Sequence, residues 1–191
     1  SYLNYYSWKF FNISLNPNQV IAGNENFLFL GNGYANVLDN HRGLNKASSS
    51  LKNFDNNLKS VENWYLNKKI PFVFVIAPNK HSIYNSFLPD NYKKTGPNAT
   101  DNVINIINVS NNRILDLRDS IGEQFDTKDL KYHKLDTHWN KYGAFLGYKS
   151  IINHINEKYK LKIIPISVNF NKVPFILRGA DLSMFLKASK L

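Results

Sequence analysis

The stretch Ile70-Pro71-Phe72-Val73-Phe74-Val75-Ile76-Ala77 is an almost unbroken run of β-branched and aromatic residues. Such runs are typical of strands buried on both faces of a parallel sheet, because helices cover both faces of that kind of sheet. Pro78-Asn79-Lys80 ends the run, and ligands of open α/β sheets usually bind at the carboxyl ends of strands. We therefore predict a central parallel strand, with candidate site residues near its end.

Strands and helices are predicted to alternate along the rest of the chain. Apolar residues recur at helical spacing from Leu51 to Tyr65, behind three serines (48–50) that can cap a helix, and Asn140 is a good N-cap for a helix to about Tyr159. Further strands are predicted at 26–30, 113–117 and 130–135, a β-prone segment at 161–168, and helices at 101–108 and within 178–187. This order predicts an α/β fold, a three-layer sandwich with a mostly parallel sheet.

Size and composition indicate one ordinary globular domain. The chain has 191 residues, 43% of them apolar and 20% charged, which suits a single core and excludes a disordered chain. We expect an aromatic, Asn-rich lead-in segment at 1–20 and an α/β domain at 21–191. No stretch has the roughly 20 apolar residues that cross a bilayer, and Ser1 to Phe11 lack a signal-peptide pattern, so we expect any export signal to be removed or absent.

The chain has no cysteine and a net charge of +10. The first fact excludes disulfides, thiolate metal sites and a cysteine nucleophile. The second favours anionic partners such as acidic polysaccharide, phospholipid headgroups or nucleic acid. Lys68-Lys69 and Lys93-Lys94 are the nearest approach to basic clusters, and we interpret them as solvated surface rather than a binding stripe.

Asp136-Thr137-His138 carries the strongest chemical signal. Extended residues two apart face the same way, so the carboxylate can fix one imidazole nitrogen and leave the other free to accept a proton from a serine hydroxyl. By spacing alone, a surface pair or a helix-capping Asp beside a structural His explains the motif better. His133 can complete a zinc-ligand set of imidazoles and carboxylate, but its spacing favours the opposite face, and other metallophosphoesterase elements are absent.

Three separated stretches, in order, resemble the alginate O-acetyltransferase-type, SGNH-hydrolase-like family. Gly23 to Phe29 resembles its G-x-x-x-W-L-F segment, with Phe27 in place of the usual Trp. Ile76 to Lys80, followed by Ile83-Tyr84, resembles its strand-end P-x-K and I-Y elements. Tyr132 to Ala144 resembles its Y-x-x-x-D-x-H-W-x-x-x-G-A signature, the most specific of the three.

The resemblance implies that Asp136 is the orienting acid and His138 the general base of a Ser-His-Asp triad. It implies an SGNH-hydrolase-like sandwich that is incomplete at the C-terminal end of this chain. It also implies a periplasmic or otherwise extracytoplasmic enzyme, anchored by a segment missing from this chain, that acetylates a cell-surface or exported polysaccharide. A membrane-bound acyltransferase would donate the acetyl group, with no cofactor, metal or nucleic acid involved.

The family's serine follows the Asp-His pair, in a turn after a further strand, and no such turn is visible before Leu191. Gly179-Ala180-Asp181-Leu182 resembles the helix start that precedes this serine. Ser183 lacks the sharp turn that exposes a nucleophile, and Ser82 has no family precedent, so we predict that neither is the nucleophile.

Lys80 and Tyr84 are predicted to hold an anionic substrate or an acetyl carbonyl, although a solvated Lys and a packed Tyr are the commoner roles. The missing serine leaves two further functions open. One is a non-catalytic glycan-binding or assembly module of the same fold, and the other is a carbohydrate esterase that uses water as the acyl acceptor.

Overall fold

The computed structural model describes residues 2–44, 51–111, 113–169 and 180–186. The elements follow one another as α1 (Tyr2–Phe11), β1 (Val20–Ala22), η1 (Asn24–Asn26), β2 (Leu28–Leu30), α2 (Val37–Arg42), α3 (Leu51–Asn67), β3 (Phe74–Ile76), α4 (Lys80–Ile83), η2 (Asn85–Phe87), η3 (Asp90–Tyr92), α5 (Ala99–Asn111), β4 (Ile114–Asp116), α6 (Leu117–Ile121), α7 (Lys141–Tyr159) and α8 (Asp181–Phe185). Helices are thus predominant, and the strands are short.

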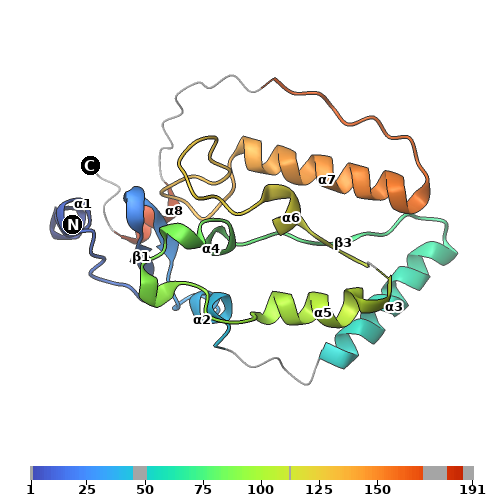
Figure 1. Ribbon diagram of the computed structural model, residues 1–191, viewed down its shortest axis with the longest axis horizontal. Coiled ribbons are helices and arrows are strands. Elements are labelled where there is room, and N and C mark those ends of the chain that lie inside the picture. Colours follow the sequence, from blue (N-terminus) through green and yellow to red (C-terminus); the bar gives the residue numbers. More distant parts are fainter. Residues whose placement is uncertain (1, 45–50, 112, 170–179, 187–191) are drawn as a thin grey trace.

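The predicted strand at 70–77 is confirmed in part, as β3. It pairs in parallel with β4, from Phe74 opposite Ile114 to Ile76 opposite Asp116, and the pair lies between α7 and the helices α3 and α5 (Figure 1). Helix side chains of Leu58 and Ile107 pack with Ile114 in a buried cluster. β3 is only half-buried, and among the described residues it pairs with β4 alone. The wider parallel sheet of a three-layer sandwich stays a prediction.

The second sheet is an antiparallel pair, β1 with β2, and it confirms the strand predicted near 26–30. Beside it lies an aromatic core in which Phe27, Phe29, Tyr84 and Phe87 are buried and in ring contact. A Cβ on Gly23 would lie 2.7 Å from the carbonyl oxygen of Phe87, so only glycine allows this close approach. This core supports the loop that carries Asp136 and His138.

The predicted helices at 51–65, 101–108, 140–159 and 178–187 correspond to α3, α5, α7 and α8. The capping serines 48–50 lie outside the described residues. The strand predicted at 130–135 is wrong, and the β-prone segment at 161–168 forms no strand. In the second segment, Ile164 is 88% exposed, Pro165 cannot donate to a sheet, and the side chain of Asn156 binds both the N–H and the carbonyl of Ile163.

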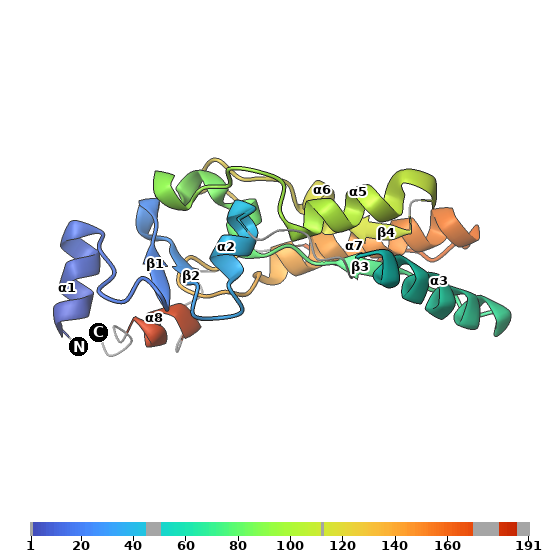
Figure 2. The ribbon, with the colours of Figure 1, turned by 90° about the horizontal axis from the view of Figure 1, so that it is seen from below.

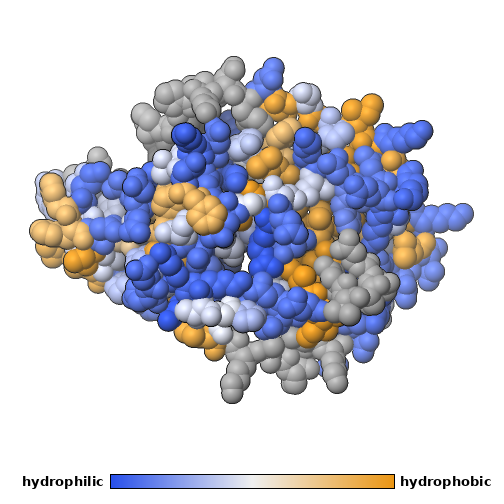
Figure 3. Space-filling view, in the orientation of Figure 1, coloured by the Kyte–Doolittle hydropathy of each residue, from blue (hydrophilic) through white to orange (hydrophobic). Residues whose placement is uncertain are grey.

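The lead-in segment forms α1 at one end of the molecule (Figure 2). Its Trp8 is buried in a cluster with Leu28 of β2 and with Leu182 of α8. Apolar side chains are also visible on the surface at the α1 end (Figure 3), where Phe10 and Phe11 are each 71% exposed. The boundary at residue 20 stays a prediction. Among the described helices, none is both long and apolar enough to cross a membrane.

Two buried imidazoles, His41 and His81, lie beside the aromatic core with ring centroids 5.7 Å apart. Nε2 of His81 lies 2.9 Å from the carbonyl oxygen of Leu30, so it must carry the proton, while the buried Nδ1 has no partner among the described residues. Burial lowers the pKa of His81 to about 3 and also lowers the pKa of His41. Both rings are therefore neutral in the folded protein at pH 7.

We expect acid to destabilise the protein through these histidines. Because unfolded His81 binds the proton at about pH 6.5 and folded His81 only near pH 3, this residue does not change the free energy of unfolding above pH 6.5. It should fall by about 1.4 kcal/mol per pH unit for His81 between those values. Urea unfolding at pH 7.5 and 5.0 measures this. His81→Gln, which can still donate to Leu30, should lose about 2 kcal/mol less; an equal loss would contradict the assignment.

Candidate active site

The residues Asp136 and His138 lie at the tip of a loop that leads into α7. An isolated antiparallel bridge between Tyr132 and Trp139 closes the loop. Asn140 then begins the helix, because its Oδ1 accepts hydrogen bonds from the N–H groups of Tyr142 and Gly143 at 2.9 and 3.0 Å. The predicted N-cap is thus confirmed. A Cβ on Gly143 would overlap the carbonyl oxygen of Lys131, so glycine lets the loop pack on the helix.

Asp136 and His138 form the hydrogen-bonded pair that the sequence suggested. Nδ1 of His138 lies 2.6 Å from Oδ1 of Asp136, and the backbone N–H of His138 donates to the same oxygen at 2.9 Å. The Asp136 side chain is 13% exposed and that of His138 is 76% exposed. No hydrogen bond joins Nε2 of His138 to any described residue, so this nitrogen is open to an incoming group. The pair has the arrangement of an orienting acid with its base.

The environment separates the protonation behaviour of the two groups. Burial would raise the pKa of Asp136, but hydrogen bonds from the N–H groups of Asp181 and His138 and from the imidazole outweigh it and lower this pKa. The hydrogen bond to Asp136 raises the pKa of His138, and the charges of Asp136 and Asp181 add to it. Asp136 is therefore ionised when His138 accepts a proton, which is what a base stabilised as imidazolium requires.

Asp181, the first residue of α8, is the site residue that sequence reasoning missed. Its Oδ2 lies 3.7 Å from Nδ1 of His138, and its backbone N–H donates to Oδ2 of Asp136 at 3.0 Å. The signal in the sequence was the Gly179-to-Leu182 helix start, which places a carboxylate there. Its distance of 45 residues from Asp136 concealed the contact.

Ligand atoms of Asp136, His138 and Asp181 all lie within 4.8 Å of one another, so these residues could hold a metal ion. All four carboxylate oxygens, however, already accept hydrogen bonds: those of Asp136 from His138 and Asp181, and those of Asp181 from Thr137 and Leu182. Oδ1 of each carboxylate accepts two of these bonds, while each Oδ2 accepts one and keeps a lone pair. Nδ1 of His138 is itself engaged with Asp136 at 2.6 Å, so the arrangement is that of an acid-base pair, and His133 does not belong to the cluster.

Lys80 and Tyr84 lie beneath the loop rather than at its surface. Lys80 is 3% exposed, and its ammonium donates to the carbonyl oxygens of Leu28, His133, Lys134 and Asp136 at 2.7 to 3.1 Å. Burial lowers the pKa of Lys80 well below its ordinary value, against the charges of Asp181 and Asp136. A substrate has no access to this group, which instead ties the loop to β2.

The fully buried Tyr84 supports the other side of the loop. Its hydroxyl accepts from the backbone N–H groups of Lys131 and Tyr132 at 2.8 and 3.3 Å and donates to Oε1 of Gln124 at 2.9 Å. The substrate contacts predicted for Lys80 and Tyr84 therefore require correction: both side chains are interior, and both hold the backbone of 131–136. These contacts also explain why 130–135 is a loop, because side chains satisfy the backbone groups that a sheet would pair.

The two candidate serines are not joined to His138. The hydroxyl of Ser183 donates to the carbonyl oxygen of Ala180 at 2.7 Å, within the first turn of α8. Ser82 lines a small pocket at the carboxyl end of β3, together with Asn79, His41 and Arg118. Among the described residues, no serine hydroxyl is hydrogen-bonded to His138.

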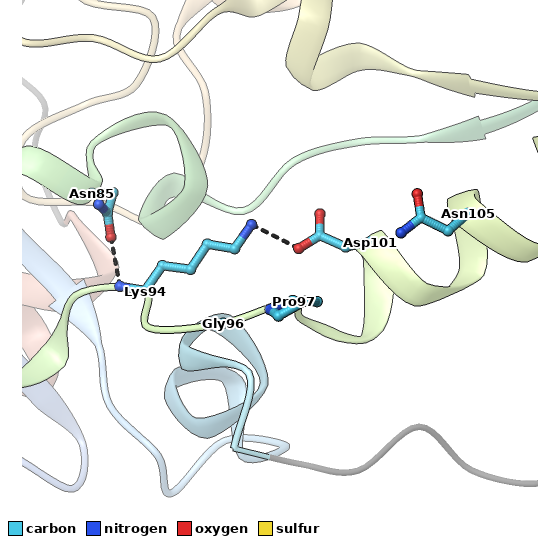
Figure 4. A pocket seen from close by; sticks show the side chains of 6 residues that line it. All are labelled: Asn85, Lys94, Gly96, Pro97, Asp101 and Asn105. Carbon is cyan, nitrogen blue, oxygen red and sulfur yellow. Dashed lines mark hydrogen bonds and ion pairs between the residues drawn. The ribbon is translucent and has the colours of Figure 1, made fainter.

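A separate open groove lies away from the loop and is lined by Asn85, Lys94, Gly96, Pro97, Asp101 and Asn105 (Figure 4). Lys94 and Asp101 form an ion pair across it at 2.7 Å, and Asp101 also binds Arg118. Because these charged groups are paired with one another, we assign the groove a structural role rather than a catalytic one.

Comparison with known proteins identifies the fold. The O-acetyltransferase domain of Pseudomonas putida AlgJ has a similar structure, with a TM-score of 0.56 at 20% sequence identity, over 90% of this chain and 60% of that one. The chain thus spans 60% of the length of this solved structure. No curated protein matches. A family model described as the SGNH hydrolase-like domain of acetyltransferase AlgX matches residues 20–190, and the chain therefore belongs to this family.

Proposed function

We propose that this protein takes part in O-acetylation of a polysaccharide, with Asp136 and His138 as two members of a Ser-His-Asp triad. The observation that carries the proposal is the 2.6 Å contact between Asp136 and Nδ1 of His138, which leaves Nε2 open. Membership of a family named for an acetyltransferase supports acyl transfer as the reaction class. Location outside the cytoplasm is part of the proposal.

In the proposed reaction, Nε2 of His138 accepts the proton of a serine hydroxyl as the serine oxygen attacks the acetyl carbonyl of a donor. The imidazolium then protonates the leaving group, and an acetyl-serine remains. In the second half, His138 takes the proton of a sugar hydroxyl, the sugar oxygen attacks the acetyl-serine, and the serine hydroxyl is restored. Asp136 stays ionised and stabilises the imidazolium in both halves.

The acetyl donor in this proposal is a membrane-bound acyltransferase, and the acceptor is a cell-surface or exported polysaccharide. The net charge of +10 supports an acidic glycan, since a positive surface attracts an anionic polymer. We also propose that the nucleophilic serine lies outside the described residues, downstream of the Asp-His pair, in a domain completed as a three-layer sandwich.

Acetyl labelling tests the proposal. When the 191-residue chain is incubated with an activated acetyl ester, we expect no serine to be labelled, because a base without a neighbouring nucleophile forms no acyl-enzyme. A longer chain that includes the serine should gain one acetyl group, detected by mass spectrometry, and lose it when His138 is replaced. Acetylation of Ser82 or Ser183 that depends on His138 would show that the nucleophile is misplaced. No labelling in the longer chain would favour a non-catalytic glycan-binding or assembly module. Release of the acetyl group to water would favour an esterase.

A further inference from the structure

Asp181 contacts all three residues of the loop tip, through its backbone N–H and both of its carboxylate oxygens. Its backbone N–H donates to Oδ2 of Asp136 at 3.0 Å. Its Oδ1 accepts from the N–H of Thr137 at 2.9 Å, and its Oδ2 accepts from the hydroxyl of the same residue. Its Oδ2 also lies 3.7 Å from Nδ1 of His138. One residue thus connects α8 to the whole Asp136-Thr137-His138 tip.

These contacts restrict the geometry of the pair. Oδ1 of Asp136 already accepts from His138, so the bond from Asp181 to Oδ2 fixes the plane of the carboxylate. The bonds to Thr137 fix the backbone between acid and base. α8 itself is anchored, because Leu182 is fully buried and the N–H of Ser183 donates to the carbonyl of Leu135 at 3.3 Å.

Within the described part of the chain, three kinds of charged or titratable group influence His138. Asp136 and Asp181 supply negative charge beside Nδ1. His133 lies close enough that the charge of His138 lowers its pKa. The ammonium of Lys80 lies behind the loop, on the carbonyl of Asp136. Asp181 therefore adds a carboxylate to that of Asp136 in stabilising a protonated His138.

We propose that Asp181 is a positioning residue of the Asp136–His138 pair, which holds the acid and the loop in place and adds a second negative charge beside the imidazole. It acts through Asp136, Thr137 and His138 and contacts no reacting atom. The reaction that the pair serves rests on the proposed function. The contacts of Asp181 do not, because they lie within this chain.

Three substitutions separate the contribution of the Asp181 hydrogen bonds from that of its negative charge. Asp181→Asn can keep the bonds to Thr137, since an amide oxygen accepts from its N–H and an amide nitrogen donates to its hydroxyl oxygen, and it removes the charge. Asp181→Ala removes both. Asp119→Asn is the matched control, because Asp119 is exposed on α6 and the chain loses the same charge.

NMR titration of the His138 ring in the 191-residue chain gives the decisive readout. We expect the pKa of His138 to fall in Asp181→Asn and to keep its wild-type value in Asp119→Asn. In a chain that transfers acetyl groups, the acidic limb of the pH profile of kcat/KM should move to lower pH in Asp181→Asn, and kcat should fall further in Asp181→Ala. If Asp181→Ala does not fold, the His138 titration in Asp181→Asn still tests the inference.

An unchanged His138 titration in folded Asp181→Asn would overturn the inference, even if acetyl transfer depended on His138. Conversely, a lowered pKa of His138 with no His138-dependent transfer in any chain would leave Asp181 as a positioning residue and remove the proposed reaction. The two failures are thus distinguishable.

Discussion

Replacing His138 by Ala is expected to lower acetyl transfer by about 10⁴-fold or more in a chain that carries its serine, as loss of a triad member does in serine hydrolases. The reason is the loss of the imidazole whose Nε2 moves the proton in both half-reactions of the proposed mechanism. The fold should be intact, because the His138 side chain is 76% exposed. Initial rates of acetylation with a polysaccharide acceptor measure the effect.

Asp136→Asn should cost about 10⁴-fold in turnover for a related reason. Both carboxylate oxygens of Asp136 accept from N–H donors of His138 and Asp181, so the amide of Asn would meet a donor in either orientation. His154→Ala, on α7, is the control for loss of an imidazole and should transfer at the wild-type rate. A folded His138→Ala protein with wild-type activity would refute the assignment of the base.

Lys80→Met should have the largest effect on stability. The substitution leaves the carbonyl oxygens of Leu28, His133 and Asp136 without this donor, while that of Lys134 still accepts from the N–H of Leu28. Each buried polar group without a partner costs about 1–3 kcal/mol. Met has no charge to desolvate, which offsets part of this cost. We therefore expect a net loss of about 3 kcal/mol in the free energy of unfolding. Urea unfolding monitored by tryptophan fluorescence measures it.

Lys149→Met provides the matched control, because Lys149 is exposed on α7 and the same atoms change. Its free energy of unfolding should stay within about 0.5 kcal/mol of the wild-type value. Equal stability of Lys80→Met and Lys149→Met would contradict the role of Lys80 as the tie between β2 and the loop. A stable Lys80→Met chain that no longer bound polysaccharide would instead restore the substrate-binding role that the sequence suggested.

Local patterns predicted much of the fold. The helical apolar spacing and the cap at Asn140 predicted α7 to within a residue, because capping and periodicity are properties of adjacent residues. The run at 70–77 predicted β3 and its parallel orientation, but the strand is shorter and half-buried. The run at 130–135 failed because its backbone groups bind Lys80 and Tyr84 from a distant part of the chain, and no local pattern records such a contact.

The candidate site also contains contacts that local patterns predicted and contacts that they did not. Asp136 and His138 are two residues apart, so their contact could be predicted from spacing and from the family signature. The contact with Asp181 depends on the placement of α8, which in turn depends on burial of Leu182 beside Trp8. Lys80 was correctly associated with the site but assigned to its surface, since the sequence cannot show that four carbonyl oxygens converge on its ammonium.

The tautomer of His138 is the most direct test of the claim that Asp136 orients this ring as a base. In the 191-residue chain with ¹⁵N-labelled histidine, above the pKa of His138, we expect the NMR spectrum to show a proton on Nδ1 and an unprotonated Nε2. Asp136→Asn should lose this preference. A His138 ring that carries its proton on Nε2 in the wild-type chain would contradict the account, because no lone pair would then face an incoming serine.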